Sequence, residues 1–385
     1  MSKLLGLLLI EISGTGLMSF SCGSFVLYLE DALHFKRSAF FLINSFTILF
    51  SALSLPFFKR FLKKLGASKT VFLCALFSSI NYLGFSFFKS YFAFLFLGIL
   101  NGLFINGISS PVVIEVLNND FKEKSTGILS FILSLSTLFS AIFVNLLRFI
   151  NDRFSYKWGY RTIAALGLGF AILGAFLIRG TSFKQRDTKK KPVNFKDQEV
   201  NLYSLLLFWG NFCNLALFNN LVPYLKELGT EGKKAYFLSS AVVFLVVFSR
   251  LFWGFLFSRF KAKNTLPILL ISPFLSSVLF ILGRHSSLFI YPSLIFLAFN
   301  ACFNSLPASS LNMEYKNKEN DSLTLLLFFS ILGSSLGSST CALIYDINKS
   351  YLLFWIVLSV LCPVFFVLAV YLKRHYPYDR PVISG

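Results

Sequence analysis

The sequence predicts an all-α membrane protein with twelve transmembrane helices arranged as two six-helix halves. Three observations lead to this fold class. The 385 residues are 56% hydrophobic and only 14% charged, whereas soluble domains carry about 25% charged residues. Apolar runs that are long enough to cross a bilayer recur along the whole chain. Segments of the two halves also repeat each other, and a polar, basic segment divides them.

A helix needs about 20 apolar residues to cross the hydrocarbon core of a bilayer. This length divides the chain into twelve predicted spans. Most of the breaks between them are short, so we expect neighbouring helices to run antiparallel. The spans are residues 4–29, 39–58, 70–88, 91–117, 125–147, 162–178, 202–225, 235–258, 265–283, 287–313, 323–345 and 351–372.

The longest break between spans, residues 179–201, is polar and basic and is expected to be a flexible linker. It separates a six-helix bundle of residues 1–178 from a second bundle of residues 202–385. Pro111 and Pro307 lie 196 residues apart in similar segments, and each is followed by a Lys-Glu pair at the same spacing. Duplicated halves are typical of secondary transporters, which hold their substrate between the halves near the middle of the membrane.

Lys and Arg predict the orientation, because cytoplasmic loops are enriched in them. The side that holds the linker and both termini carries roughly twice as many Lys and Arg as the other side. We therefore expect a multi-pass integral membrane protein, of the cell membrane, with both termini in the cytoplasm. The net charge of +19 does not indicate nucleic-acid binding, because the basic residues lie in short breaks between apolar runs. The sequence implies no particular oligomer.

No pattern in the sequence indicates an enzyme, a cofactor or a metal site. A phosphate-binding loop is absent, so ATP is not expected to drive the protein directly. The six Cys lie inside apolar runs without paired spacing, and the three His fall in loops or near a chain end. The expected partners are a small-molecule substrate, the lipid bilayer and, in a symporter, a proton.

Polar residues inside the spans recur with a period of three helices. Side chains such as Asn, Glu and Arg face the bundle interior or a water-filled cavity, because lipid offers them no partner. They are most frequent in spans one, four, seven and ten, and nearly absent from spans three, six, nine and twelve. This pattern predicts a central cavity lined by the first group of spans, with the last group facing lipid.

Five asparagines on these polar spans are the predicted substrate-binding amides. Pairs of them are spaced three or four residues apart, so each pair shares one face of its helix. They could instead join helices to one another through hydrogen bonds. The candidates are Asn101, Asn211, Asn214, Asn300 and Asn304.

The arrangement resembles the major facilitator superfamily over the whole chain, in span number, duplication and linker position. In that superfamily the same four spans line the substrate path, so the resemblance implies a secondary active transporter that works by alternating access. Residues 56–71 occupy the place of a loop signature of the family, with Gly66 kept and Lys63 at the aspartate position. Residues 250–263 are the counterpart in the second half, with Ser258 at the aspartate position.

Two segments resemble the monocarboxylate and oxalate/formate branch of the superfamily. Residues 21–46 are similar to its first hairpin, and residues 249–254, SRLFWG, are similar to its eighth span. In that branch an arginine at the position of Arg250 contacts the substrate carboxylate, which implies a small organic anion. Ser330 stands near the position of a second cation in the oxalate/formate group. A single buried cation fits a monoanion or a zwitterion better than a dianion, so a lactate-like monocarboxylate or an amino acid is expected rather than oxalate.

Arg250 lies inside a long apolar run, so it needs a partner that offsets its burial. The cost of placing Arg in a membrane span is about 2.5–3.5 kcal/mol on insertion scales. The partner could be a substrate carboxylate, which a guanidinium can bind through two hydrogen bonds. It could also be Glu11 of the first span, backbone carbonyls, or water. A Glu11–Arg250 pair that opens on substrate binding would let Glu11 take up a proton.

Three other interpretations remain open from the sequence. Within the transporter class, the protein could carry neutral amino acids or other small metabolites, or it could export drugs through a larger and more aromatic cavity. Outside that class, it could be a membrane sensor that keeps the fold and binds its ligand without transporting it.

Glu115, near the cytoplasmic end of the fourth span, is expected to pair with a nearby Lys.

Overall fold

The computed structural model of the chain is a bundle of helices. It describes residues 2–19, 25–121, 125–180, 197–304, 306–315 and 322–375. Within these residues, eleven helices are long and apolar enough to cross a membrane, and one bent pair completes the twelve predicted spans. The predicted fold class is therefore confirmed. Most of the predicted linker lies outside the described residues, and its last residues already belong to a helix that begins at Gln198.

Spans two, three, five, six, eight, eleven and twelve are continuous helices. Each extends beyond its predicted apolar run at one end or both, because helices continue into the polar boundary of the membrane that a hydropathy threshold leaves out. They are α3 (Arg37–Leu65), α4 (Ala67–Phe87), α7 (Ser125–Arg153), α8 (Tyr156–Leu177), α11 (Gly232–Arg259), α16 (Ser322–Asn348) and α17 (Leu352–His375).

The first and fourth spans are interrupted helices. The first consists of α1 (Ser2–Glu11), the π-helical η1 (Ile12–Ser19) and, after a gap in the described residues, α2 (Val26–Leu33). The fourth consists of α5 (Tyr91–Ile105), the 3₁₀ turn η3 (Asn106–Ile108) and α6 (Ser110–Asp120).

The seventh, ninth and tenth spans are interrupted as well. The tenth bends by 45° between its two parts. The segments are α9 (Gln198–Asn219) and α10 (Leu221–Glu227) in the seventh, α12 (Ala262–Leu269) and α13 (Ile271–Gly283) in the ninth, and η5 (Ser287–Phe289), α14 (Ile290–Asn300), η6 (Ala301–Asn304) and α15 (Leu306–Glu314) in the tenth.

Proline accounts for the breaks in the fourth and tenth spans. Pro111 and Pro307 lie in the first turns of α6 and α15, where the missing proline N–H leaves no hydrogen bond unmade. Each of these helices follows a 3₁₀ turn, and their first residues, Ser110 and Leu306, are separated by the 196 residues of the predicted repeat. The two halves therefore carry the same break at the same place.

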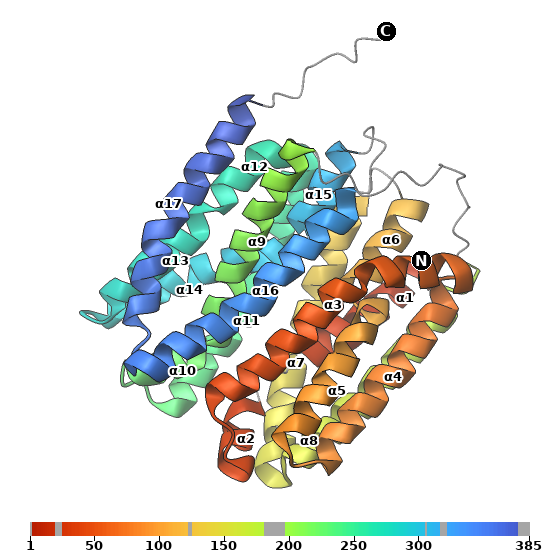
Figure 1. Cartoon of the computed structure of the whole chain (residues 1–385), viewed down its shortest axis with the longest axis horizontal. Helices are drawn as coiled ribbons and strands as arrows, with labels where there is room; N and C mark the ends of the chain where they lie inside the picture. Colours follow the sequence, from red (N-terminus) through yellow and green to blue (C-terminus); the bar gives the residue numbers. More distant parts are fainter. Residues whose placement is uncertain are drawn as a thin grey trace.

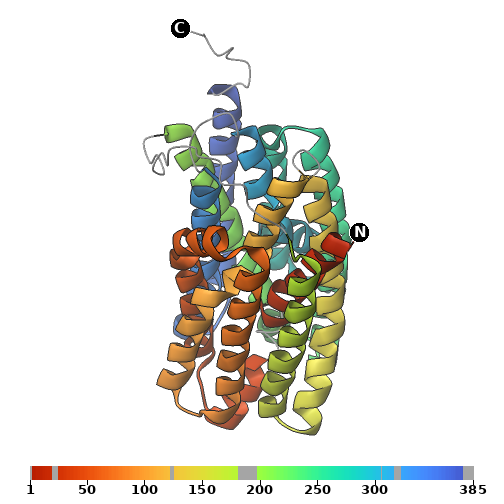
Figure 2. The ribbon, with the colours of Figure 1, turned by 90° about the vertical axis from the view of Figure 1, so that its right-hand side faces the viewer.

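Two helix pairs make most of the contact between the first half, α1 to α8, and the second half, α9 to α17. The helix α3 packs against α16, and α7 packs against α11. The pair of α3 and α16 crosses the middle of the molecule in Figure 1. Figure 2 faces the first half and shows its long helices side by side. Within the halves, α4 packs on α8 and α9 packs on α16.

The outer surface of the bundle is apolar. Phe92 and Phe237 are 77% and 71% exposed, and many other large apolar side chains on the long helices are also exposed. A soluble protein rarely exposes such extensive apolar surface. Together with the twelve spans, this surface identifies an integral membrane protein that crosses the bilayer several times.

Ion pairs join helices within each half at the end where α1 begins. Lys59 of α3 lies 3.0 Å from Glu115 of α6, which confirms the expected Lys partner of Glu115. In the second half, Lys263 forms an ion pair with Glu199, whose Oε1 also accepts a hydrogen bond from the Tyr315 hydroxyl at 3.0 Å. These contacts hold α3 to α6 and α9 to α12 and α15.

Glycine allows α16 and α9 to approach closely. A Cβ atom added at Gly333 would overlap the carbonyl oxygen of Phe208, and one added at Gly337 would overlap that of Phe212. Backbone contact at small residues is a common way for membrane helices to pack, because lipid provides no hydrophobic drive between them.

We expect Gly333→Ala to lower the free energy of unfolding by about 1–3 kcal/mol, because α16 must move away from α9 to make room for the new methyl group. Gly169→Ala is the matched control, since a Cβ at Gly169 meets nothing within 4 Å. Unfolding of the purified protein in detergent, followed by heat or denaturant, measures both. Equal stability of the two variants would contradict the packing argument.

Candidate functional site

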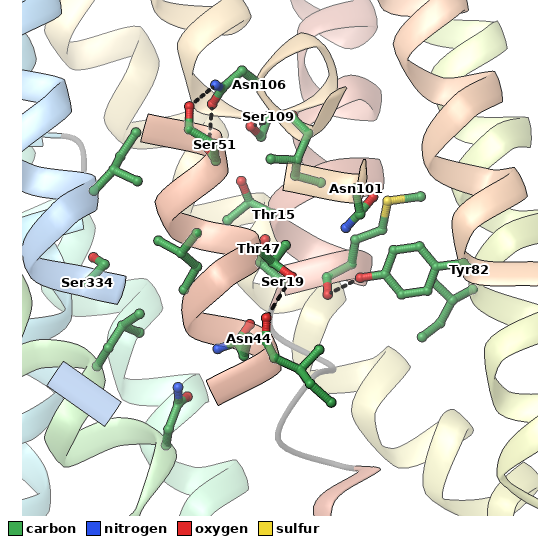
Figure 3. Close-up of a pocket in the computed structure, with 18 of the residues that line it drawn as sticks. Thr15, Ser19, Asn44, Thr47, Ser51, Tyr82, Asn101, Asn106, Ser109 and Ser334 are labelled. Carbon is green, nitrogen blue, oxygen red and sulfur yellow. Dashed lines mark hydrogen bonds between the residues drawn. The ribbon is translucent and has the colours of Figure 1, made fainter. Parts of the chain in front are cut away.

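A cavity of about 220 Å³ lies between the two halves. Most of its wall comes from the first half, namely η1, α3, α4, α8 and the interrupted fourth span, and the second half adds residues of α9 and α16. Figure 3 shows Thr15, Thr47 and Asn101 on the first-half wall, with Ser334 of α16 on the opposite side. The polar lining residues are Thr15, Ser19, Asn44, Thr47, Ser51, Tyr82, Asn101, Asn106, Ser109, Ser110, Tyr160, Asn219 and Ser334.

The break in the fourth span builds one end of this cavity. Asn106 of η3 donates through Nδ2 to the carbonyl oxygen of Ser51 at 2.6 Å and to the Ser54 hydroxyl at 2.9 Å. The Ser51 hydroxyl donates back to Asn106 Oδ1 at 2.9 Å (Figure 3). This network fixes η3 against α3 and leaves Ser109 and Ser110 on the cavity wall.

Asn101 is the predicted asparagine that lines the cavity. Its side chain is 3% exposed, and its Oδ1 has no hydrogen-bond partner among the described residues. It sits between Gly98 and Gly102, where α5 packs so closely on Thr47 of α3 that a Cβ at Gly102 would overlap the backbone. A buried amide oxygen without a partner is unfavourable, so this atom is available to a ligand.

Aromatic rings form the other end of the cavity. Phe25 stacks on Tyr160 with ring centroids 4.2 Å apart, and Phe85 lies 5.2 Å from the same ring. The Tyr82 hydroxyl donates to the carbonyl oxygen of Met18 at 2.8 Å, which orients its ring along the wall. All these residues line the cavity, and so does Phe94.

The described lining of the cavity contains no charged side chain. Its polar groups are hydroxyls and carboxamides, which can donate and accept hydrogen bonds. Transfer of a charge into such a site without a counter-charge is costly. The cavity in this conformation is therefore suited to an uncharged polar molecule.

Glu11 lies directly behind the cavity wall. The carboxylate is fully buried, and its Oε1 accepts a hydrogen bond at 2.7 Å from the hydroxyl of Ser110, which lines the cavity. Its Oε2 has no hydrogen-bond partner among the described residues. Thr15, one turn further along the same span, also lines the cavity. The Ser110 hydroxyl therefore links the Glu11 carboxylate to the cavity.

Arg250 connects the two halves and does not line the cavity. Its Nη1 donates to the carbonyl oxygen of Leu133 at 2.8 Å and to the Thr137 hydroxyl, both on α7. Ser130 of α7 donates in turn to the carbonyl oxygen of Arg250 at 2.6 Å. One helical turn away, a Cβ at Gly254 would overlap the Ser130 side chain. The backbone-carbonyl partner considered from the sequence is thus present.

Glu11 and Arg250 are close enough for their charges to interact. The ion pairs found among the described residues do not include one between them. Their roles in proton coupling and in substrate binding stay predictions.

The other predicted asparagines lie outside the cavity lining. Asn211 joins helices, because its Nδ2 donates to the Phe303 carbonyl at 3.0 Å and to the Ser330 hydroxyl at 2.7 Å. Asn214 Oδ1 and both polar atoms of Asn300 are buried without a hydrogen-bond partner in the described part of the chain. The side chain of Asn304 lies outside the described residues.

The cavity also differs from the predicted set of helices. Spans one, four and seven contribute to it as predicted, but no described residue of span ten does. Tyr82 and Tyr160 reach it from spans three and six, which were predicted to face lipid alone. The prediction counted amide and charged side chains, and therefore missed lining residues such as Thr15 and Ser109. The sequence did contain a signal for three further lining residues, because each is an asparagine within a predicted span. They are Asn44, Asn106 and Asn219.

The sequence pattern that defines the Major Facilitator Superfamily matches residues 8–338. This match covers most of the chain. The chain belongs to the Major Facilitator Superfamily. Proteins of this superfamily are transporters, so the chain is assigned to a class of transporters and not of enzymes. A search of curated protein sequences finds no match.

Solved structures of other superfamily transporters share the fold of this chain. The nucleoside transporter NupG is 16% identical, with a TM-score of 0.72 over 96% of this chain and 98% of that one. The fucose:proton symporter FucP of E. coli is 13% identical, with a TM-score of 0.68 over 96% and 97%. The human organic anion transporter TETRAN is 16% identical, with a TM-score of 0.66 over 96% and 98%. At these identities the similarity shows the fold alone.

Substitutions of two asparagines should separate a structural amide from a ligand-binding one. We expect Asn211→Ala to lower the free energy of unfolding by about 1–3 kcal/mol, because it leaves buried groups without partners. Asn101→Ala should lower it by less than about 1 kcal/mol, since Asn101 Oδ1 has no partner to lose. Denaturant unfolding in detergent measures both values. A larger loss for Asn101→Ala would show that this residue supports the fold.

Proposed function

We propose that this chain is a secondary active transporter that moves a small, uncharged polar solute across the membrane by alternating access, together with a proton. The observation that supports this most strongly is the cavity between the halves, whose described lining offers hydroxyls, carboxamides and aromatic rings but no charge. Hydrogen bonds with Thr15, with the acceptor Oδ1 of Asn101 and with the Ser109 hydroxyl as acceptor would replace those that a hydroxyl-bearing solute makes with water.

The size of the cavity argues for a small metabolite. Sites for drug-sized ligands measure about 300–1,000 Å³, whereas this cavity measures about 220 Å³. A drug exporter is therefore the weaker alternative. A neutral amino acid also fits less well, because its ammonium and carboxylate groups would both need charged or strongly polar partners.

Glu11 is the proposed proton site. A buried carboxylate oxygen without a hydrogen-bond donor is costly while the group is charged, and a proton on that oxygen removes the cost. The Ser110 hydroxyl bridges Glu11 Oε1 and the cavity. A solute that binds Ser110 would change the hydrogen bond to Glu11, and this change would couple solute binding to proton uptake.

A small monocarboxylate is the second candidate substrate. Arg250 is fully buried and within electrostatic reach of Glu11, so a cation capable of binding a carboxylate lies near the cavity wall. Transport of an anion would require the Arg250 guanidinium to leave Leu133 and Thr137 and turn toward the cavity. The same guanidinium would then be exchanged between α7 and the substrate during each cycle.

Uptake into proteoliposomes tests these proposals. We expect radiolabelled uridine or fucose, as probes of uncharged hydroxylated solutes, to enter faster under an inward proton gradient, and lactate to enter slowly or not at all. Glu11→Gln keeps the acceptor for Ser110 but cannot carry a proton, so it should abolish the gradient stimulation and leave solute exchange intact. Glu115→Gln is the matched control, because Glu115 pairs with Lys59 away from the cavity.

Three results of these uptake measurements would contradict the proposal. Lactate uptake that is lost in Arg250→Gln would favour the monocarboxylate. Binding of a solute without uptake of any would favour the sensor. Gradient stimulation that survives in Glu11→Gln would remove Glu11 as the proton site.

A further inference from the structure

Five polar and aromatic residues from both halves meet at the end of the bundle opposite the start of α1. They belong to α2, α7, α10 and α11, and α2 and α10 lie at the bottom of Figure 1. The Lys and Arg distribution predicts that this end faces away from the cytoplasm. We name these residues the interhalf cluster: Tyr28, Arg148, Asp152, Lys226 and Tyr236.

Within the first half, two contacts orient the guanidinium of Arg148. Its Nε lies 3.6 Å from Oδ2 of Asp152, one turn further along α7. The Tyr28 hydroxyl of α2 donates a hydrogen bond to the other oxygen, Asp152 Oδ1. Asp152 therefore ties the end of the first span to the end of the fifth and holds Arg148 toward the second half.

Within the interhalf cluster, the ring of Tyr236 makes the contact between the two halves. Cζ of Arg148 lies 4.9 Å from the ring centroid, and Nζ of Lys226 lies 5.7 Å from the same centroid. Both distances are within the range of attraction between a cation and an aromatic ring. The ring on α11 thus receives one cation from α7 of the first half and one from α10 of its own half.

This cluster lies just beyond the aromatic end of the cavity. Tyr28 follows Phe25, which lines the cavity, by one helical turn. Lys226 lies in α10, the short helix that follows α9 and its last residue, the cavity-lining Asn219. A solute that leaves the cavity in this direction must pass between the helices that the cluster holds together.

We propose that Tyr236 and the Arg148–Asp152 pair form the outer gate of the cavity, and that their contact must break each time the cavity opens to that side. This proposal rests on the alternating access of the proposed function. The side chains of Arg148 and Asp152 are 40% and 54% exposed, so the contact is screened by water and weak. A weak contact suits a gate, because it favours the closed state without preventing its opening.

Distances between spin labels can test the gate without any solute. Labels at Arg153→Cys and Lys233→Cys occupy exposed sites at the ends of α7 and α11, next to the cluster but outside it. The full chain is reconstituted in lipid nanodiscs, and the chain without the two new cysteines gives the background. We expect Tyr236→Ala and Arg148→Gln each to raise the ratio of long to short distances about two- to fivefold.

Two matched variants show whether the cation–ring contact is responsible. Tyr236→Phe keeps the ring and should leave the distances as in the unmutated chain. Arg161→Gln removes a guanidinium that lies 5.0 Å from the Trp158 ring and 5.3 Å from the Phe87 ring, all within the first half, and should also leave them unchanged.

The proposal is overturned if neither Tyr236→Ala nor Arg148→Gln shifts the distances, or if Arg161→Gln shifts them equally. A shift for Tyr236→Phe as large as that for Tyr236→Ala would assign the contact to the hydroxyl and overturn the role of the ring. Thermal unfolding of each variant identifies any that fails to fold. If either Arg148→Gln or Tyr236→Ala does not fold, the other variant, which removes the same contact, decides the test. Because no solute is present, a failure of the proposed transport function does not alter this result.

Discussion

In the hydrocarbon of a bilayer, a backbone amide that leaves a helix has no water to bind, so irregular backbone is tolerated only where protein encloses it or where it borders a cavity. This constraint is consistent with interruptions in the polar first, fourth, seventh and tenth spans, while α4, α8 and α17 are continuous. The apolar ninth span is also interrupted, between α12 and α13, just after Pro267. At the break in the fourth span, the Ser109 hydroxyl donates to the carbonyl oxygen of Ile105 at 2.8 Å, and the Asn106 side chain anchors η3 to Ser51 and Ser54 of α3. Broken helix, polar side chains and cavity therefore occur together in the fourth span.

The same constraint acts on the charge of Arg250. A guanidinium has five donors and no acceptor, so in the membrane it needs oxygen atoms from its own protein. It finds them on α7, where the Leu133 carbonyl already takes part in the helix and accepts further bonds from Thr137 and Arg250. Any movement of α7 against α11 must satisfy this guanidinium again, and the charge of Glu11 is within its electrostatic reach.

The sequence was sufficient for most of the fold because its signals there are collective. Runs of about 20 apolar residues and a repeated proline each report on many residues at once. The structure has the predicted spans, and both halves carry a break before the repeated proline. The site was harder to predict, because the partner of a single side chain depends on which helix faces it. Asn101 and Asn211 look alike in the sequence, yet one lines the cavity and the other bonds to Phe303 and Ser330. The lining hydroxyls gave no signal, since Ser and Thr are common in membrane helices for reasons of packing.

The contact of Gly254 with Ser130 has a mechanical consequence. With no side chain on α11 at this position, the axes of α7 and α11 approach closely there, and reciprocal bonds with Arg250 fix the spacing. If the halves rotate about this point as rigid bodies, the ends of the helices act as lever arms. Arg148 lies 18 residues along α7 from Ser130, which is about 27 Å in a straight helix. A rotation of about 10° would then carry it roughly 5 Å, so a small movement at the pivot becomes a wide one at the mouth of the cavity.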